Sequence, residues 1–306
     1  MAISTRYTFD RSVLRMQDAQ TRIGDTQAQL STGKRIVNAS DDADRVNTIQ
    51  RVQSALQRQD NYAQTLTTLD DRLRTQETAL NNASNALIRL KELTVQAAND
   101  TMGPADRQNI AVELESLKQD LLGLANTRDV NGNYLFGGTR VGAAPFASEP
   151  GGVAAYHGDQ TTIEVAVGDQ RRVVANRAGS DVFTGVVRDT PDGPQGVGFF
   201  QVIDDLTAAV RGSDRARMTR ALGEIDKLQE GFSGALAEVG ADARVVELQR
   251  GIIEDTRLRL QSTLSGLQDT DYTEAVTRLN KEMLALEAAQ SSFAKASSLN
   301  LFNFLK

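Results

Sequence analysis

The sequence predicts a mainly α-helical protein with a β-rich insert. We expect a long antiparallel helical rod, a coiled coil or helix bundle formed by the N- and C-terminal halves, with a small central β domain. Three observations lead to this fold class. A seven-residue leucine repeat runs through residues 49–99, glycine and proline concentrate between residues 132 and 198, and a seven-residue apolar repeat returns after residue 241.

The leucine repeat predicts the longest helix. Apolar residues recur every seven positions in two rows, at Leu66, Leu73, Leu80 and Leu87 and at Leu69, Ala83 and Leu90. Only Gln76 interrupts the second row, and no Pro or Gly lies between Val37 and Gly103 to break the helix. Such a seam needs a partner helix to cover it. At about 1.5 Å per residue this helix would extend over roughly 75 Å, too long to wrap one compact core.

A weaker repeat precedes it near the N-terminus. The repeat positions carry Val13, Met16, Ile23 and Leu30, with Gln20 and Gln27 in the gaps. A helix with so sparse a seam is marginal in water by itself. Two interpretations remain open: an ordinary surface helix, or a helix that becomes ordered only on assembly, which we favour.

A Gly-Lys pair follows this helix at Gly33 and Lys34. A phosphate-binding loop would need Gly where Ala28 stands and Ser or Thr where Arg35 stands. The nucleotide interpretation therefore fails. We expect Gly33 to end the helix in the left-handed conformation, with the two basic side chains near its negative end.

The start of the long helix carries a capping pattern. Ser40 is a suitable N-cap, and Asp41, Asp42 and Asp44 would lie in the first turn. These aspartates lack the spacing and the Gly of an EF-hand, so we expect capping and no metal site.

A helical hairpin should follow the long helix. Gly103-Pro104 makes the turn, with Pro104 at the first helical position and Asp106 in the first turn. The second helix has an uninterrupted apolar row at Ile110, Leu114, Leu117, Leu121 and Leu124. The short connection makes the two helices antiparallel.

The central segment has a different composition. Of the 24 glycines, 13 lie between Gly132 and Gly198, as do four of the five prolines. Residues 161–167 and 171–175 alternate as two strands joined by a two-residue turn at Gly168-Asp169, and residues 183–187 are a further candidate strand. Four aromatic residues could form a small core: Phe136, Phe146, Tyr156 and Phe183. An insert of about 60 residues is near the lower limit for independent folding.

Helix returns after a predicted linker at residues 191–198. Two short amphipathic helices are expected around Leu206 and Ile225. The seven-residue step resumes from residue 241 at Val246, Ile253, Leu260 and Leu267 and continues at Val276, Leu279, Met283, Leu286 and Phe293. The chain closes on apolar Leu299, Phe302 and Leu305 at a tail that should otherwise be frayed. These residues should dock either on their own chain or on a neighbouring subunit, and the two sparse terminal helices favour the neighbour.

Composition excludes several classes of protein. The 40 acidic and 34 basic residues give a net charge of −6 without a basic block, so nucleic acid is not an expected partner. The absence of cysteine excludes disulfides and thiol catalysis. No apolar run approaches the roughly 20 residues of a membrane span, and residues 1–10 lack a secretory h-region. By default these features predict a cytoplasmic protein.

Three stretches together resemble the bacterial flagellin and hook-associated protein family. They are Leu30-Ser31-Thr32-Gly33-Lys34-Arg35-Ile36 with Ser40-Asp41-Asp42-Ala43, then Leu90-Lys91-Glu92-Leu93-Thr94-Val95-Gln96-Ala97-Ala98-Asn99, and Ala237-Glu238-Val239-Gly240-Ala241. The resemblance covers residues 1–140 and 200–306, but not the insert. Within the family, Asn133-Tyr134-Leu135-Phe136-Gly137-Gly138-Thr139 and the C-terminal Leu301-Phe302-Asn303-Phe304-Leu305 are similar to members of the hook–filament junction, although Phe304 stands where those members have Tyr.

The resemblance implies a structural part of the flagellum, an adaptor joining hook to filament, with the filament subunit flagellin as the alternative. It implies five segments: residues 1–45 and 266–306 as the halves of an inner coiled coil, 46–136 and 197–265 as the halves of a helical rod, and 137–196 as an outer β domain. Expected subunit-interface residues are Val13, Met16, Ile23, Leu30, Met283, Leu286, Phe293, Leu299 and Phe302.

The resemblance also implies partners and a location. The partners would be hook-associated protein 1, flagellin, further copies of this chain in a ring, and a cytoplasmic export chaperone. The location would be extracellular, reached through the flagellar type III system without a cleaved signal peptide, which replaces the cytoplasmic default. No cofactor or membrane insertion is implied.

Two other classes of protein fit the sequence less well. An enzyme housed in the insert would need clustered titratable groups, yet the insert holds one histidine, His157, and no nucleophile with a base beside it. A signalling coiled coil would need the membrane spans and basic flanks of a receptor. We therefore expect a structural protein and no enzyme.

Overall fold

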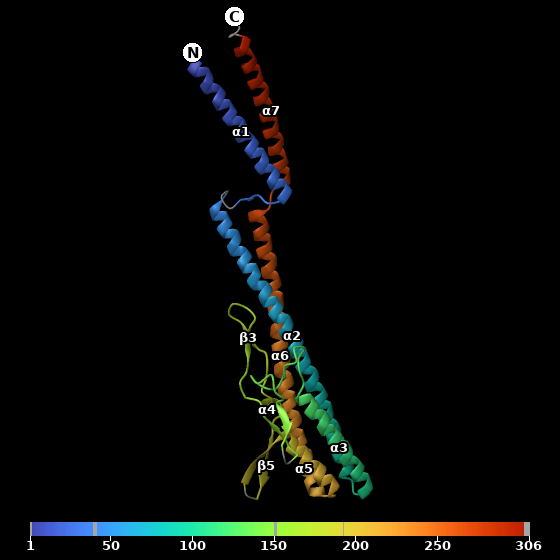
Figure 1. Ribbon diagram of the computed structural model, residues 1–306. Coiled ribbons are helices and arrows are strands. Elements are labelled where there is room, and N and C mark those ends of the chain that lie inside the picture. Colours follow the sequence, from blue (N-terminus) through green and yellow to red (C-terminus); the bar gives the residue numbers. More distant parts are fainter. Residues whose placement is uncertain (1, 39–41, 150–151, 192, 303–306) are drawn as a thin grey trace. The chain divides into compact units, whose positions relative to one another are not determined.

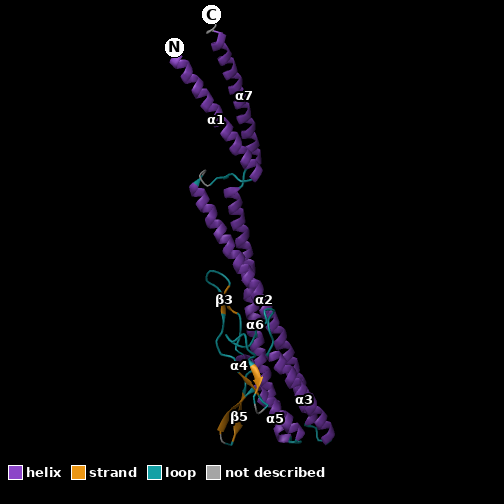
Figure 2. Cartoon of the chain, in the orientation of Figure 1, coloured by secondary structure: helices purple, strands orange, loops and turns teal. Residues whose placement is uncertain are grey.

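The computed structural model describes residues 2–38, 42–149, 152–191 and 193–302, with side chains from Tyr7 to Lys295 apart from Thr8. Its helices are α1 (Ala2–Thr32), α2 (Ala43–Ala97), α3 (Pro104–Ala125), α4 (Gly179–Val182), α5 (Phe199–Arg211), α6 (Arg215–Gln268) and α7 (Tyr272–Phe302) (Figure 1). Its strands are β1 (Phe146–Ser148), β2 (Ala154–Tyr156), β3 (Glu164–Ala166), β4 (Arg172–Val174), β5 (Val186–Thr190) and β6 (Gly193–Val197) (Figure 2). The predicted class, mainly α with a β-rich insert, is confirmed.

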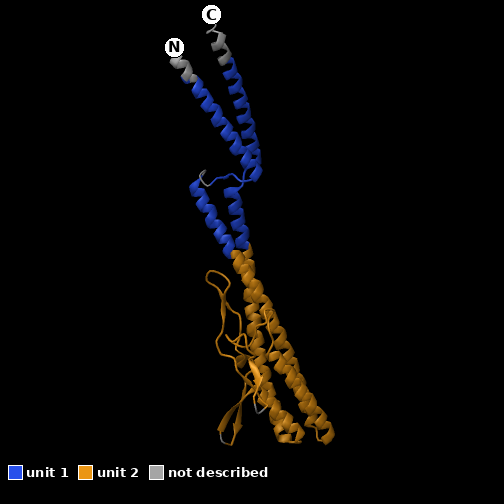
Figure 3. Ribbon diagram, viewed as in Figure 1, with its two compact units in different colours: residues 1–58, 255–306 blue, residues 59–254 orange. Residues whose placement is uncertain are grey.

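The chain divides into two compact units (Figure 3). Unit 1 comprises residues 1–58 and 255–306, and unit 2 comprises residues 59–254. Unit 1 combines a segment from each end of the sequence, whereas unit 2 is one continuous segment. Helices α2 and α6 each contribute residues to both units.

Helix α2 carries the predicted leucine seam into the core of unit 2. Leu66, Leu73, Leu80 and Leu87 are at most 1% exposed. Gln76, which interrupts the second row, is also buried, and its side-chain Nε2 donates a hydrogen bond to the Ala175 carbonyl at 3.2 Å. The interruption is therefore a polar contact with the insert, because a buried amide needs a partner.

The N-cap of α2 differs from the prediction. The helix begins at Ala43, and Asp42 caps it through Oδ1, which accepts a hydrogen bond from the Arg45 amide at 3.0 Å. Asp42 is therefore the cap and not a first-turn acid. Ser40 and Asp41 lie outside the described residues.

The helical hairpin of α2 and α3 is confirmed. Pro104 occupies the first turn of α3, and the Asp106 carboxylate accepts a hydrogen bond from the Gly103 amide at 3.2 Å. The side chain of Arg107 donates to the Ala97 carbonyl at 2.9 Å and so closes the last turn of α2. Farther along, Arg89 and Glu113 pair between the two helices at 2.8 Å.

The insert forms three two-stranded antiparallel hairpins, β1–β2, β3–β4 and β5–β6. The predicted β3–β4 pair is present, but its turn has three residues, 168–170, because the Val167 amide bonds to the Arg171 carbonyl. The third strand begins at Val186, three residues later than predicted, because Phe183 ends α4 and turns into the core. The segment predicted as a linker contains β6, which pairs with β5.

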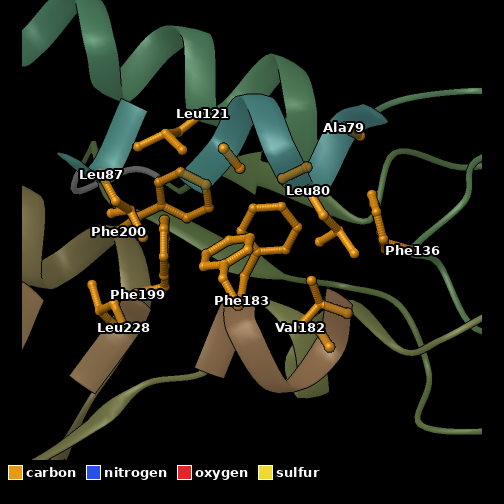
Figure 4. Packing of buried hydrophobic residues seen from close by; sticks show 14 of the residues in the cluster. Ala79, Leu80, Leu87, Leu121, Phe136, Val182, Phe183, Phe199, Phe200 and Leu228 are labelled. Carbon is orange, nitrogen blue, oxygen red and sulfur yellow. The ribbon is translucent and has the colours of Figure 1, made fainter. Parts of the chain in front are cut away.

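Aromatic side chains join the insert to the helices. Phe183 lies at the centre, with its ring 5.6 Å from Phe136, 5.3 Å from Phe146, 5.3 Å from Phe199 and 5.2 Å from Phe232 (Figure 4). The four predicted core aromatics thus meet, together with aromatics of α5 and α6. The buried apolar residues of insert and helices belong to one cluster, so the insert shares its core with the helices of unit 2.

Helix α6 is longer than the sequence suggested. The short helix predicted around Ile225 and the helix expected from residue 241 are one element of 54 residues. Six glycines lie inside it, and packing against the core offsets their low helix propensity. The two parts of the C-terminal apolar repeat, which end at Leu267 and begin again at Val276, belong to separate helices, because residues 269–271 lie between α6 and α7.

Candidate assembly interface

Unit 1 holds the terminal helices as an antiparallel pair, α1 with α7 (Figure 1). The closest packing uses small residues: Ala19, Thr26 and Ala275 are at most 9% exposed. Small side chains allow two helices to approach closely, so the pair forms although the α1 repeat is sparse. Gln20 and Gln27, which fill gaps in that repeat, are exposed.

Polar side chains set the register of the pair. Thr26 Oγ1 donates a hydrogen bond to Glu282 Oε2 at 3.1 Å, and Arg278 Nη2 donates to Gln29 Oε1 at 3.0 Å. A one-turn slip would break both bonds. Near the start of α1 and the end of α7, the ring centroids of Phe9 and Phe293 lie 4.6 Å apart.

The structure places most of the predicted interface residues along this pair. Val13, Met16, Ile23 and Leu30 of α1 and Leu286 and Phe293 of α7 are half-buried, whereas Met283 is 51% exposed. Leu299 and Phe302 lie within α7, but their side chains are outside the described part of the chain. Contact of any of these residues with a neighbouring subunit stays a prediction. The apolar repeat did not identify two residues of the seam, Ala19 and Thr26. The signal for them in the sequence is a pair of small side chains seven residues apart.

The Gly-Lys-Arg segment joins the end of α1 to the break between α6 and α7. Gly33 has a φ of 69°, which confirms the predicted left-handed cap. The Arg35 amide donates to the Gln268 carbonyl at 2.7 Å, and its guanidinium donates to the Leu267 carbonyl at 3.0 Å. The Thr270 amide in turn donates to the Gly33 carbonyl at 2.9 Å. The motif thus joins the C-terminal end of α1 to the C-terminal end of α6 through backbone hydrogen bonds.

Unit 1 buries few side chains. Among its described side chains, only Ala19, Thr26, Thr270 and Ala275 are buried. Large apolar side chains remain exposed in it at Tyr7, Phe9, Leu14, Val37, Leu258, Tyr272, Val276, Met283 and Leu284. Two helices with so small an interior gain little of the packing that stabilises helices in proteins. Unit 1 therefore has an apolar surface of the kind that a partner molecule covers.

The Asn133–Thr139 motif is a structural joint in unit 2. Its Leu135 and Phe136 are fully buried. The Asp159 carboxylate accepts hydrogen bonds from the Thr139 amide at 3.0 Å and from the Thr139 hydroxyl, and these bonds lower the pKa of Asp159 to about 2. Gly138 has a φ of 65° and lies against the Asp159 backbone, so this position requires glycine.

A second set of bonds ties the insert to α6. The Arg188 guanidinium pairs with Glu224 of α6 and with Asp205 of α5. These contacts raise the pKa of Arg188, and the hydrogen bonds with Glu224 are the largest cause. Arg177 pairs with Asp242 of α6 at 2.5 Å. Burial raises the pKa of Asp242 although Arg177 opposes this shift.

The histidine of the insert lies at the protein surface. His157 is half exposed, and its nearest acidic partner is Glu149 at 3.8 Å. Among the residues placed in the structure, no three His, Asp or Glu side chains could hold a metal ion together. Within the same residues, no helix combines the length and apolar character needed to cross a membrane.

Comparison with protein families accounts for both ends of the chain. A model described as the bacterial flagellin N-terminal helical region matches residues 3–140, and one described as the bacterial flagellin C-terminal helical region matches residues 222–305. The chain belongs to the bacterial flagellin and hook-associated protein family. The flagellin N-terminal region contains α1–α3 and the Asn133–Thr139 joint, and the C-terminal region contains most of α6 and all of α7.

Similarity to individual family members runs along the whole chain. It is 26% identical over 316 residues to flagellar hook-associated protein 3 of Salmonella typhimurium, covering 99% of both chains. It is 27% identical over 320 residues to flagellar hook-associated protein 3 of Escherichia coli, covering 100% of both. The crystal structure of Xanthomonas campestris FlgL superimposes with a TM-score of 0.60 at 25% identity, covering 71% of this chain and 99% of that one.

Proposed function

We propose that this chain is a structural subunit of the bacterial flagellum at the junction between hook and filament. The observation that carries this proposal is the extent of the similarity to hook-associated protein 3. It includes residues 141–221, which both flagellin family models leave unmatched. Association with other flagellar proteins follows from a junction role, and chemistry is not required for it.

The terminal helices are the assembly element in this proposal. Residues 1–45 and 266–306 would form the two halves of an inner coiled coil, residues 46–136 and 197–265 the two halves of a helical rod, and residues 137–196 the outer β domain. The small interior of the α1/α7 pair supports this assignment, because such a pair gains most of its burial from neighbouring subunits. Val13, Met16, Ile23, Leu30, Met283, Leu286, Phe293, Leu299 and Phe302 are the proposed contact residues.

The specific partners belong to the same proposal. They are further copies of this chain in a ring, hook-associated protein 1 on the hook side, flagellin on the filament side, and an export chaperone in the cytoplasm. The subunit would leave the cell unfolded through the flagellar type III system. A terminal pair with few buried side chains suits this route, since little structure has to be undone.

Electron microscopy of cells that lack this gene tests the proposal. Hooks without filaments, with flagellin released into the medium, are expected if the chain is the junction adaptor. Filaments that persist in shortened or altered form would instead assign it as flagellin, the alternative that the helix around Leu93 favours. Unaltered flagella would contradict both assignments. Restoring filaments with the full-length gene is the control.

A further inference from the structure

Two hairpins of the insert border a groove of about 710 Å³ within unit 2. Strand β2 lines it with Ala154–Tyr156, and β6 lines it with Gln195–Val197. The partner strands β1 and β5 contribute only Phe146 and Arg188. The groove therefore runs along the outer edges of β2 and β6. In the described part of the chain, β2 pairs with β1 alone and β6 with β5 alone, so both outer edges are free of a neighbouring strand.

The register of β1 and β2 shows which backbone groups lie on the outer edge of β2. Two hydrogen bonds flank the paired strands: the Glu149 amide to the Val153 carbonyl at 2.9 Å, and the His157 amide to the Pro145 carbonyl at 2.7 Å. Because bonded pairs alternate along an antiparallel ladder, Ala155 is the residue of β2 that bonds to β1. The amide and carbonyl groups of Ala154 and Tyr156 therefore point to the outer edge.

The outer edge of β1, in contrast, is closed by a side chain. The Asn126 amide group accepts a hydrogen bond from the Phe146 amide at 3.0 Å and donates one to the Phe146 carbonyl at 2.8 Å. This side chain takes the place of a neighbouring strand. Strand β2 carries neither a proline nor a charged residue, the two devices that commonly keep a further strand from an edge.

Strand β6 supplies the opposite wall of the groove. Pro194 has no amide hydrogen, which fits an outward position on an edge strand, and Gly196 is two residues later and faces the same way. An added Cβ at Gly196 or at Gly198 would meet no atom within 4 Å. The Gly196 amide and carbonyl are therefore accessible to another backbone.

The floor of the groove is aromatic, and its charges are balanced. Phe183, Phe199 and Phe200 line it (Figure 4). Of the described residues in its lining, Arg188 and Asp205 are charged, and they pair with each other at 2.6 Å. Such a floor accepts apolar side chains and offers no free charge to an ionic ligand.

A β-strand fits both the edges and the floor of this groove. Its backbone would bond to the free edges, while every second side chain would pack on the aromatic floor. A small apolar molecule would leave the edge amides and carbonyls unpaired. The described strands of this chain are all paired in hairpins, so a second copy has no free strand to offer. The occupant that fits is therefore a strand from a different protein.

We propose that a different protein of the flagellum inserts an extended, uncharged segment, with apolar side chains at every second position, between β2 and β6. The inserted strand bonds to the backbone of Ala154 and Tyr156 on one side and of Gly196 on the other. This inference rests on the proposed junction function, which brings the chain beside other flagellar proteins. It gives the insert a docking role separate from that of the terminal helices.

Photo-crosslinking in assembled flagella tests the occupant. Benzoylphenylalanine would replace Gln195, which is exposed and lines the groove, or, as the control, Val187, which is 61% exposed on the same hairpin and is not part of the lining. We expect the Gln195 variant to form an adduct with another flagellar protein at an uncharged segment of alternating apolar residues, located by mass spectrometry. The Val187 variant should form no adduct with that segment.

Three results of the crosslinking would overturn the proposal. They are dimers of this chain through Gln195, an adduct at a charged or helical segment, and the same adduct from both variants. An incorporated Gln195 variant without any adduct would count against it equally. Both sites are exposed, so both variants should fold.

Amide hydrogen exchange of the unmodified chain gives an independent measurement. The Ala154 and Tyr156 amides lie on the outer edge of β2, whereas the Ala155 and His157 amides are bonded across the hairpin. We expect exchange at Ala154 and Tyr156 to be about tenfold slower, or more, in assembled flagella than in the free subunit, with the rates of Ala155 and His157 unchanged. Equal rates in both states at Ala154 and Tyr156 would overturn the strand groove. Filaments that persist after deletion of the gene would instead contradict the junction function.

Discussion

The guanidinium of Arg188 holds the carboxylate of Glu224 through two hydrogen bonds, from Nε at 2.7 Å and from Nη2 at 2.9 Å. Arg188 lies in β5 and Glu224 in α6, 36 residues apart, and the two side chains are 13% and 8% exposed. Paired, charge-assisted hydrogen bonds of this geometry are stronger than hydrogen bonds between neutral groups. This ion pair fixes the β5–β6 hairpin on the helices of unit 2.

Replacing Arg188 with Ala should destabilise unit 2 by about 3 kcal/mol, because it removes the two short hydrogen bonds of the buried Glu224 carboxylate and leaves it with the longer ion pair to Arg220, at 3.5 Å. The Arg188→Ala, Glu224→Gln double variant should recover part of this loss. Urea unfolding of the full chain, followed by circular dichroism, measures both. Arg74→Ala is the control, since Arg74 is 72% exposed and its pair with Asp70 should contribute less than about 1 kcal/mol. An Arg188 effect as small as that of Arg74 would contradict the prediction.

Replacing Gly138 with Ala should destabilise unit 2 by more than about 1 kcal/mol. Gly138 has a positive φ, and an added Cβ would lie 2.3 Å from the Asp159 carbonyl oxygen. Gly142→Ala is the matched control, because nothing lies within 4 Å of its Cβ position and its φ is ordinary. Thermal unfolding of the two variants should separate them clearly. Identical melting temperatures would show that the joint tolerates a side chain.

Acid should loosen the joint between Thr139 and Asp159. The hydrogen bonds from the Thr139 hydroxyl and amide lower the folded-state pKa of Asp159 from 3.8 to about 2. A carboxyl whose pKa is lowered by folding contributes stability that is present above its unfolded pKa. This contribution should be lost as the pH falls from about 4 to about 2. The difference in stability between wild type and Asp159→Asn, measured from pH 6 to pH 2, should shrink over that range, and a constant difference would refute the assignment.

Replacing Leu286 with Asp should abolish incorporation while unit 2 stays folded. Leu286 is half-buried between α1 and α7, so a charge there separates the terminal helices. Unfolding of unit 2 should change by less than about 0.5 kcal/mol, because Leu286 makes no part of its core. Ala285→Asp is the control, since Ala285 is exposed and lines a groove that also holds the charged side chains of Arg278 and Lys281. Normal filament length and yield in the Leu286→Asp strain would count against the assembly role of this seam.

The local pattern of residues determined most of the helical part. The leucine repeat and the absence of Pro and Gly specify α2, and Gly103-Pro104 specifies the turn to α3, because these features act within a few residues of one another. The same holds for Gly33, whose left-handed φ follows from its position after a helix. The β-rich insert could be placed from its glycine and proline content alone.

Only the tertiary structure decided how these elements meet. Gln76 is a defect in the sequence repeat, but in the fold it bonds to Ala175, 99 residues away. The sequence pattern predicted two separate helices where the structure has α6, and contact with the shared core keeps this helix continuous across its six glycines. Likewise, Ala19 and Thr26 of α1 are buried while Gln20 and Gln27 are exposed. Which side of α1 is buried depends on where α7 packs against it. Local propensity acts through neighbours in the chain, whereas these outcomes depend on contacts between residues far apart in sequence, which no local pattern contains.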